Sequence, residues 1–163
     1  MAIHPLQPGD PAPDFALPAV NREGQVSLAD YRGKGPFLVA LFRGLHCPFC
    51  RRQIARLSAT QKSLASEGVD TVAIVNTPLE RARLYFQYRP TRIVLAADPD
   101  VRTHHAFGLF ETKVLPDDAD PNEQKKHHAN RDAKIHLGRA FVNVNERLVG
   151  GLRFESHKGV GLQ

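Results

Sequence analysis

Residues 37–64 read FLVALFRGLHCPFCRRQIARLSATQKSL and combine an apolar run, a short loop and a segment of helical period. The run at 37–42 has the length and composition of a strand buried on both faces of a sheet. Positions 50, 54, 57, 61 and 64 share one face of a helix. Between strand and helix lie the only two cysteines of the chain, Cys47 and Cys50. A cysteine pair between a buried strand and a helix N-terminus is typical of a redox site.

The spacing of the pair predicts different roles for the two cysteines. Pro48 suits the first helical position, because it has no N–H to lose and a preset φ, so Cys47 is expected at or near the N-cap. The free N–H groups at a helix N-terminus favour a thiolate and lower a cysteine pKa from about 8.5 to roughly 3.5–7.5. Cys50 is expected on the apolar face, one turn later. We therefore predict an exposed, nucleophilic Cys47 and a shielded Cys50 that resolves the mixed disulfide.

Two other interpretations of the pair are structural cysteines and half of a zinc site. Zinc would need two more ligands, and no second Cys-x-x-Cys or spaced His pair is evident. The adjacent pairs His104-His105 and His127-His128 diverge by about 100° on a helix, so we expect surface histidines. Neither a metal nor a cofactor is predicted.

Length and composition favour one α/β domain over residues 1–163. The chain has 22 basic and 17 acidic residues, and its net charge of +5 is spread without a run of like charges. We expect no nucleic-acid partner and at most a weak preference for anionic ones. No stretch approaches the roughly 18 apolar residues of a membrane span, and no signal peptide is visible. These features, with two cysteines, predict a cytoplasmic protein with a catalytic pair.

Strands and helices are expected to alternate along most of the chain. The pattern implies parallel crossovers and an α/β sandwich. Expected strands lie at 12–18 (an edge strand), 37–42, 69–75, 93–97, 139–144 and 147–150, the last two forming a hairpin. Expected helices begin at Pro48, at Pro78 with Thr77 as the cap, and at Asp98, and a short helical turn begins at Ser27. Residues 122–135 are either a surface helix or a mobile insertion.

Several motifs resemble the thioredoxin-fold peroxiredoxin-like proteins, the alkyl hydroperoxide reductase and thiol-specific antioxidant group. The segment PGDPAPDFAL at 8–17 is similar to the opening of that family, and VSLADYRGK at 26–34 to its next block. Residues 42–51 resemble a branch with a Cys-x-x-Cys site, while Asp98-Pro99-Asp100 and Arg139-Ala140-Phe141-Val142 resemble later family segments. The resemblance implies a thioredoxin-like sandwich, a central mixed sheet flanked by helices, with an N-terminal peroxiredoxin-type extension.

The active loop departs from the usual family pattern P-x-x-x-T-x-x-C. If Cys50 takes the place of the peroxide-reacting cysteine, Arg43 stands at the proline and Cys47 at the threonine. The loop instead looks like the Cys-Pro-x-Cys of glutaredoxins and related disulfide oxidoreductases. Arg139 corresponds to a family arginine near the cysteine. Arg43 and Arg139 are thus candidates to stabilise a thiolate or orient a peroxide, the alternative being solvent-facing arginines.

The sequence therefore predicts a thiol oxidoreductase that cycles Cys47 and Cys50 between dithiol and disulfide. The resemblance implies reduction of hydroperoxides or disulfides by an external thiol donor of the thioredoxin or glutathione type. Two alternatives stay open: a true peroxidase whose cysteine becomes sulfenic acid, and a redox-sensing or protein-binding module without turnover. Because no helix is evident after Gly151 to cover the apolar sheet, we also predict a homodimer.

Overall fold

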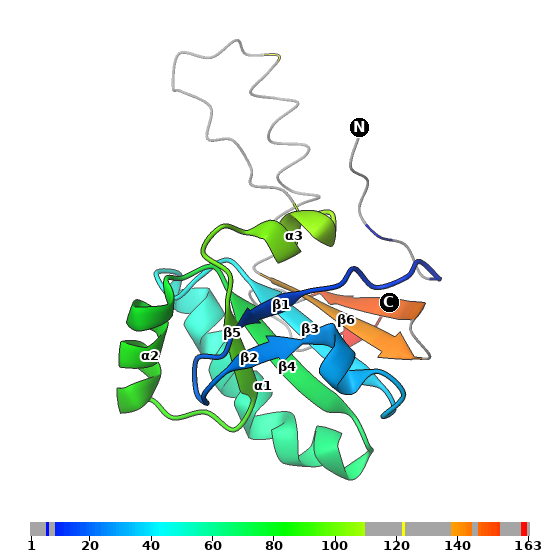
Figure 1. Ribbon diagram of the computed structural model, residues 1–163, viewed down its shortest axis with the longest axis horizontal. Helices are drawn as coiled ribbons and strands as arrows, with labels where there is room; N and C mark the ends of the chain where they lie inside the picture. The colour runs from blue at the N-terminus through cyan, green and yellow to red at the C-terminus, as the bar shows by residue number, and fades with distance from the viewer. Residues whose placement is uncertain are drawn as a thin grey trace.

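The computed structural model describes residues 6, 9–109, 122, 138–144, 147–153 and 161–162, the last three segments by their backbone. These residues form a mixed α/β fold (Figure 1). The elements in chain order are β1 (Ala16–Pro18), β2 (Gln25–Ser27), the 3₁₀ turn η1 (Leu28–Tyr31), β3 (Phe37–Phe42), α1 (Pro48–Ser66), β4 (Asp70–Val75), α2 (Leu79–Tyr88), β5 (Val94–Ala97), α3 (Arg102–Ala106), β6 (Gly138–Val144), β7 (Arg147–Arg153) and β8 (Gly161–Leu162).

A six-stranded sheet of order β5-β4-β3-β6-β7-β8 forms the centre of the fold. The pairs β3–β4 and β4–β5 are parallel, whereas β3–β6, β6–β7 and β7–β8 are antiparallel. The sequence-based prediction of a central mixed sheet is therefore confirmed. All six residues of β3 are buried, as expected for a strand in the middle of a sheet with both faces covered.

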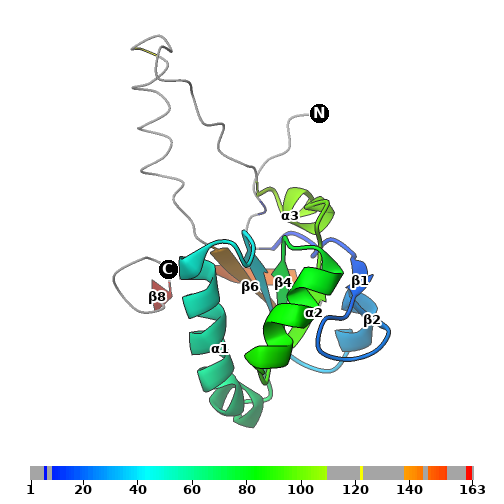
Figure 2. The same cartoon turned by 90° about the vertical axis from the view of Figure 1, so that its left-hand side faces the viewer.

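Each face of the sheet has its own apolar core. Ala40 and Phe42 of β3 pack with α1 and α2, while Val39 and Leu41 pack with the β1–β2 hairpin, η1 and Phe107 after α3. Figure 1 shows the hairpin in front of the sheet, and Figure 2 shows α1 and α2 together on one side of it. The strand–helix alternation thus places both long helices on the face that carries the cysteine pair.

The N-terminal strand is shorter than expected and belongs to a separate two-stranded sheet. It pairs with β2 rather than with the central sheet, and Gly24, with φ of +79°, accepts a hydrogen bond from Ala19 N–H in the connecting turn. Val20 N–H donates to Leu95 O, which attaches the hairpin to β5. That this hairpin is a peroxiredoxin-type extension remains a prediction.

Two helix starts differ from the sequence-based prediction. Pro78 is the N-cap of α2 instead of its first residue, because the Thr77 hydroxyl accepts a hydrogen bond from Leu45 N–H instead of capping the helix. Helix α3 starts at Arg102, four positions after Asp98, because the Asp98 carboxylate accepts the first helical N–H groups across an intervening turn. The prediction that Pro48 begins α1 is confirmed.

The predicted hairpin at 139–144 and 147–150 is present as β6 and β7, with β7 extended to Arg153. Its turn at 145–146 and nearly all of the segment 122–135 lie outside the described residues. None of the helices that the structure describes is long and apolar enough to cross a membrane.

Candidate functional site

The loop between β3 and α1 brings Cys47 and Cys50 together. Cys47 is the N-cap of α1, its N–H donates to Gly44 O at 3.2 Å, and its carbonyl accepts from Arg51 N–H at 3.2 Å. Both cysteines are in the thiol form, and their thiols are hydrogen-bonded to each other. The pair is therefore arranged to close an intramolecular disulfide within one helical turn.

The expectation of an exposed Cys47 is wrong. Cys47 is 7% exposed and belongs to the same apolar cluster as Leu45 and fully buried Cys50. In the part of the chain that the structure describes, no side-chain hydrogen bond from Cys47 caps the helix. The reason is that the Leu45 N–H is bonded to the Thr77 hydroxyl after β4, which holds the loop where Leu45 and Cys47 join the apolar cluster. Cys47 still retains a small accessible fraction that Cys50 lacks.

The environment of Cys50 keeps its thiol protonated in the reduced protein. Burial raises the pKa of Cys50 to about 12, and the hydrogen bond to Cys47 and the negative charge of a Cys47 thiolate act in the same direction. The backbone N–H groups of Gly44 and Arg43 lower the pKa of Cys50 but do not outweigh burial. The Cys50 thiol therefore stays protonated until Cys47 has reacted.

Gly44 gives the loop its shape. Its φ of +142° lies in a region that side chains rarely adopt, and a Cβ there would meet the backbone oxygen of Asn76 and, at 2.9 Å, the His46 ring. The next residue, Leu45, donates its N–H to the Thr77 hydroxyl at 2.9 Å. These contacts fix the loop against the end of β4 and hold its N–H groups at the Cys50 sulfur.

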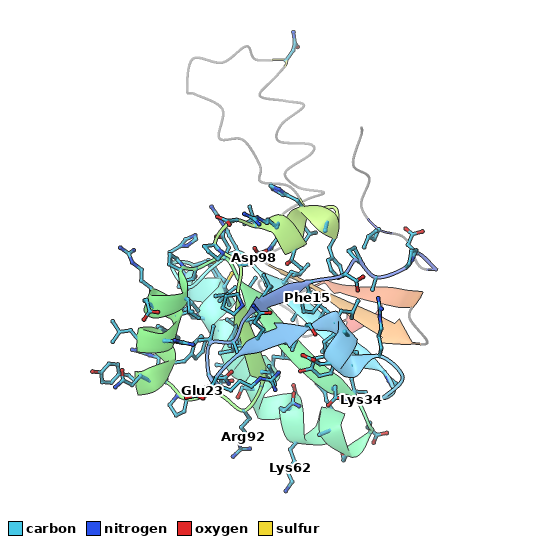
Figure 3. All side chains as sticks on the ribbon, viewed as in Figure 1. Phe15, Glu23, Lys34, Lys62, Arg92 and Asp98 are labelled. Atoms are coloured by element: carbon cyan, nitrogen blue, oxygen red, sulfur yellow. The ribbon has the colours of Figure 1, made fainter. Side chains whose placement is uncertain are left out.

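A buried acid–imidazole pair lies beside the same loop, and the sequence-based reasoning missed it. His104 is 8% exposed rather than on the surface; its Nε2 is 3.0 Å from Phe42 O and its Nδ1 3.3 Å from Asp98 Oδ2. Burial would raise the pKa of Asp98, but hydrogen bonds from His104 and from the Thr103 and Arg102 N–H groups lower it below the usual value. Figure 3 shows Asp98 below α3. The signal in the sequence for this pair is the position of Asp98, which follows a strand and precedes the segment that carries His104.

The predicted arginines lie at the same end of the sheet. Arg43 directly follows β3, and its side chain is exposed while its N–H is directed at Cys50. Arg139 lies on β6 in register with Leu41, near the end of β3, and its side chain is outside the described part of the structure. His105 is exposed, as expected, and His46 in the loop is exposed as well.

No group of three or more His, Cys, Asp or Glu residues that could hold a metal occurs among the described residues. His127 and His128 lie outside them.

Residues 8–135 match the AhpC/TSA family. The chain belongs to this family. It is 30% identical to peroxiredoxin Bcp of Escherichia coli over 111 residues, which is 68% of this chain and 70% of that relative. It is also 33% identical to the thiol-disulfide oxidoreductase ResA of Bacillus subtilis over 69 residues, 42% of this chain and 37% of ResA. The crystal structure of peroxidoxin BcpB from Mycobacterium tuberculosis superposes with a TM-score of 0.68 at 17% identity, covering 91% of this chain and 86% of that one.

Family and fold together confirm three sequence-based predictions. The resemblance to peroxiredoxin-like proteins is confirmed by the AhpC/TSA match, and the thioredoxin-like fold by the superposed structure. The chain is a thiol-dependent oxidoreductase. The names of its relatives do not favour the alternative, a redox-sensing or protein-binding module without turnover.

Proposed function

We propose that residues 1–163 form one dithiol oxidoreductase domain in which Cys47 reacts first and Cys50 resolves. The Cys47 thiolate attacks one sulfur of a substrate disulfide, a mixed disulfide forms and a thiolate leaves. Cys50 then gives up its proton and attacks the Cys47 sulfur, which expels the second substrate thiolate. An external thiol donor returns two electrons. With a hydroperoxide, the first step gives a Cys47 sulfenic acid and an alcohol, and the second releases water.

The observation that carries this order is the unequal environment of the two thiols. Cys47 retains accessible surface, whereas Cys50 is fully buried with its pKa raised to about 12 by burial. Once Cys47 is in a mixed disulfide, it can neither hydrogen-bond to Cys50 as a thiol nor carry negative charge, so two of the causes of the raised Cys50 pKa disappear. The N–H groups of Arg43 and Gly44 then favour the Cys50 thiolate when it is needed.

Arg43 and Arg139 are proposed to assist the first step. The exposed Arg43 side chain beside the loop supports a role in stabilising the thiolate or orienting the incoming oxidant. The register of Arg139 with Leu41 supports a similar role from β6. Arg→Ala at each position should slow the first step, the reaction of Cys47 with a disulfide or hydroperoxide, because a positive charge that favours the attacking thiolate or the oxidant is removed. A first step at the wild-type rate in both variants would remove the arginines from the mechanism.

The surface around the pair supports an anionic partner. No Asp or Glu occurs between Asp30 and Glu67, and the side chains of Arg51 and Arg52 are exposed in the first turn of α1. Phe49, between the cysteines, is 43% exposed and offers an apolar contact. A thiol reductant of the glutathione type, or the acidic face of a thioredoxin-type protein, fits this surface.

Peroxide and disulfide substrates can be separated with Cys47→Ser and Cys50→Ser variants. With a disulfide substrate, Cys50→Ser should accumulate one mixed disulfide at Cys47 by intact mass, while Cys47→Ser should react slowly. Comparing turnover of a hydroperoxide with that of a disulfide then identifies the better substrate class. If both cysteines of the wild type remain alkylatable after peroxide and diamide treatment, the redox assignment fails.

The cytoplasmic location and the homodimer remain proposals as well. Light scattering over a range of concentrations measures the second, and a monomeric mass at the highest concentration would refute it. Fractionation of the source cells measures the first, and recovery outside the cytoplasmic fraction would refute it.

A further inference from the structure

A continuous series of contacts joins Asp98 to the Cys50 sulfur. Asp98 Oδ2 lies 3.3 Å from His104 Nδ1, and His104 Nε2 lies 3.0 Å from the carbonyl oxygen of Phe42. The N–H of Arg43, which belongs to the same peptide group as that carbonyl, is hydrogen-bonded to Cys50. One peptide unit therefore separates the imidazole from the thiol.

The contacts of the His104 ring place a donor against Phe42. The carbonyl oxygen of Phe42 only accepts, so the contact at 3.0 Å is a hydrogen bond donated by His104 Nε2–H. On the other side of the ring, Nδ1 faces Asp98, whose carboxylate also accepts the N–H groups of Arg102 and Thr103 at 3.1 and 2.9 Å. Asp98 is thereby fixed to α3 and holds the imidazole in place.

We propose that His104 is a positioning residue for the resolving step, acting on Cys50 through the Phe42–Arg43 peptide. A donor bonded to a peptide carbonyl polarises the peptide and makes its N–H a stronger donor in turn. The Nε2–H group of His104 therefore strengthens the Arg43 N–H bond that stabilises the Cys50 thiolate. Asp98 holds the ring in this orientation. This role rests on the proposed order, in which Cys47 attacks and Cys50 resolves.

The test separates the two chemical steps in one reaction. The reduced protein is mixed with an excess of an aromatic disulfide whose leaving thiolate is coloured. Attack by Cys47 releases one coloured thiolate at a rate proportional to reagent concentration, and resolution by Cys50 releases the second at a rate independent of it. If the wild type shows no second release, the proposed function fails rather than the role of His104.

Three variants test the role of the imidazole. His104→Leu removes the donor to Phe42 O, while His104→Gln keeps an amide donor at the position of Nε2. His105→Leu alters the exposed neighbouring histidine and serves as the matched control. We expect His104→Leu to slow the second release by roughly three- to tenfold with little change in the first, His104→Gln to recover part of the loss, and His105→Leu to match wild type.

Any other result of these measurements contradicts the proposed role of His104. An unchanged second release in His104→Leu shows that the imidazole does not act on Cys50. Equal slowing in His104→Leu and His104→Gln, or equal slowing of both releases, shows a structural role only. If His104→Leu does not fold, Asp98→Asn decides. The amide oxygen can still accept one of the two α3 N–H groups, but the carboxylate beside Nδ1 is removed, so the second release should slow while the first is retained. A wild-type second release in Asp98→Asn then refutes the role.

Discussion

Replacing Gly44 by alanine should disrupt the loop that carries Cys47 and Cys50. The Cβ would meet the backbone oxygen of Asn76. This oxygen cannot move away easily, because the N–H of its peptide group, that of Thr77, donates to Val75 O at 2.9 Å and the oxygen itself accepts from the Thr77 hydroxyl at 2.8 Å. The His46 ring, 2.9 Å from the same Cβ, is exposed and can rotate away. The clash with the backbone therefore dominates.

The expected magnitude follows from two costs. A side chain at φ of +142° costs about 1–3 kcal/mol of backbone strain, and relieving the contact with Asn76 costs roughly another 1–3 kcal/mol. The sum, about 2–6 kcal/mol, is a large part of the 5–15 kcal/mol typical of a domain. Displacing the Gly44 N–H also weakens a hydrogen bond to the Cys50 thiolate worth about 1.5–3 kcal/mol, so resolution should slow by about tenfold or more.

Gly33→Ala is the matched control. Gly33 also has a positive φ, +72°, but a Cβ added there would meet no atom within 4 Å, so only strain of about 1–2 kcal/mol is expected. Urea unfolding of the reduced proteins measures the stability difference, and the second thiolate release measures resolution. Equal destabilisation in Gly33→Ala and Gly44→Ala, with normal resolution in both, would refute the assignment of Gly44 to the loop geometry.

Charge, reactivity and acid stability provide further checks on the site. Arg51→Glu should slow reaction with glutathione disulfide by about three- to tenfold at low salt and little at high salt, whereas Lys62→Glu near the end of α1 should not. Cys47 should alkylate with neutral iodoacetamide about tenfold or more faster than Cys50, and the reverse order would favour Cys50 as the peroxide-reacting residue. Because the pKa of Asp98 is lowered in the folded protein, its contribution to stability is present above about pH 4 and is lost as pH falls through the folded pKa. Asp98→Asn should therefore weaken the loss of unfolding free energy at low pH, measured by urea titration. A loss at low pH equal to that of the wild type would contradict this role of Asp98.

Local sequence patterns predict those features of the site that depend on residues close together in the chain. The apolar run of β3 and the proline at the first position of α1 depend on near neighbours, so the strand, the helix start and the position of Cys47 at the N-cap follow from them. The stripe that carries Cys50 likewise predicts its burial.

Contacts between distant segments decide the rest. Cys47 is buried because the loop is held by Thr77, 32 residues from its partner Leu45, and no local pattern reports that contact. His104 is buried against Phe42, 62 residues earlier, while His105 beside it is exposed. The sequence predicts both histidines on the surface and does not distinguish them. The sequence by itself determined that a cysteine pair begins a helix after a buried strand. Only the tertiary structure decided which N–H groups and which histidine control that pair, because side-chain periodicity specifies the face of an element and not the element that packs against it.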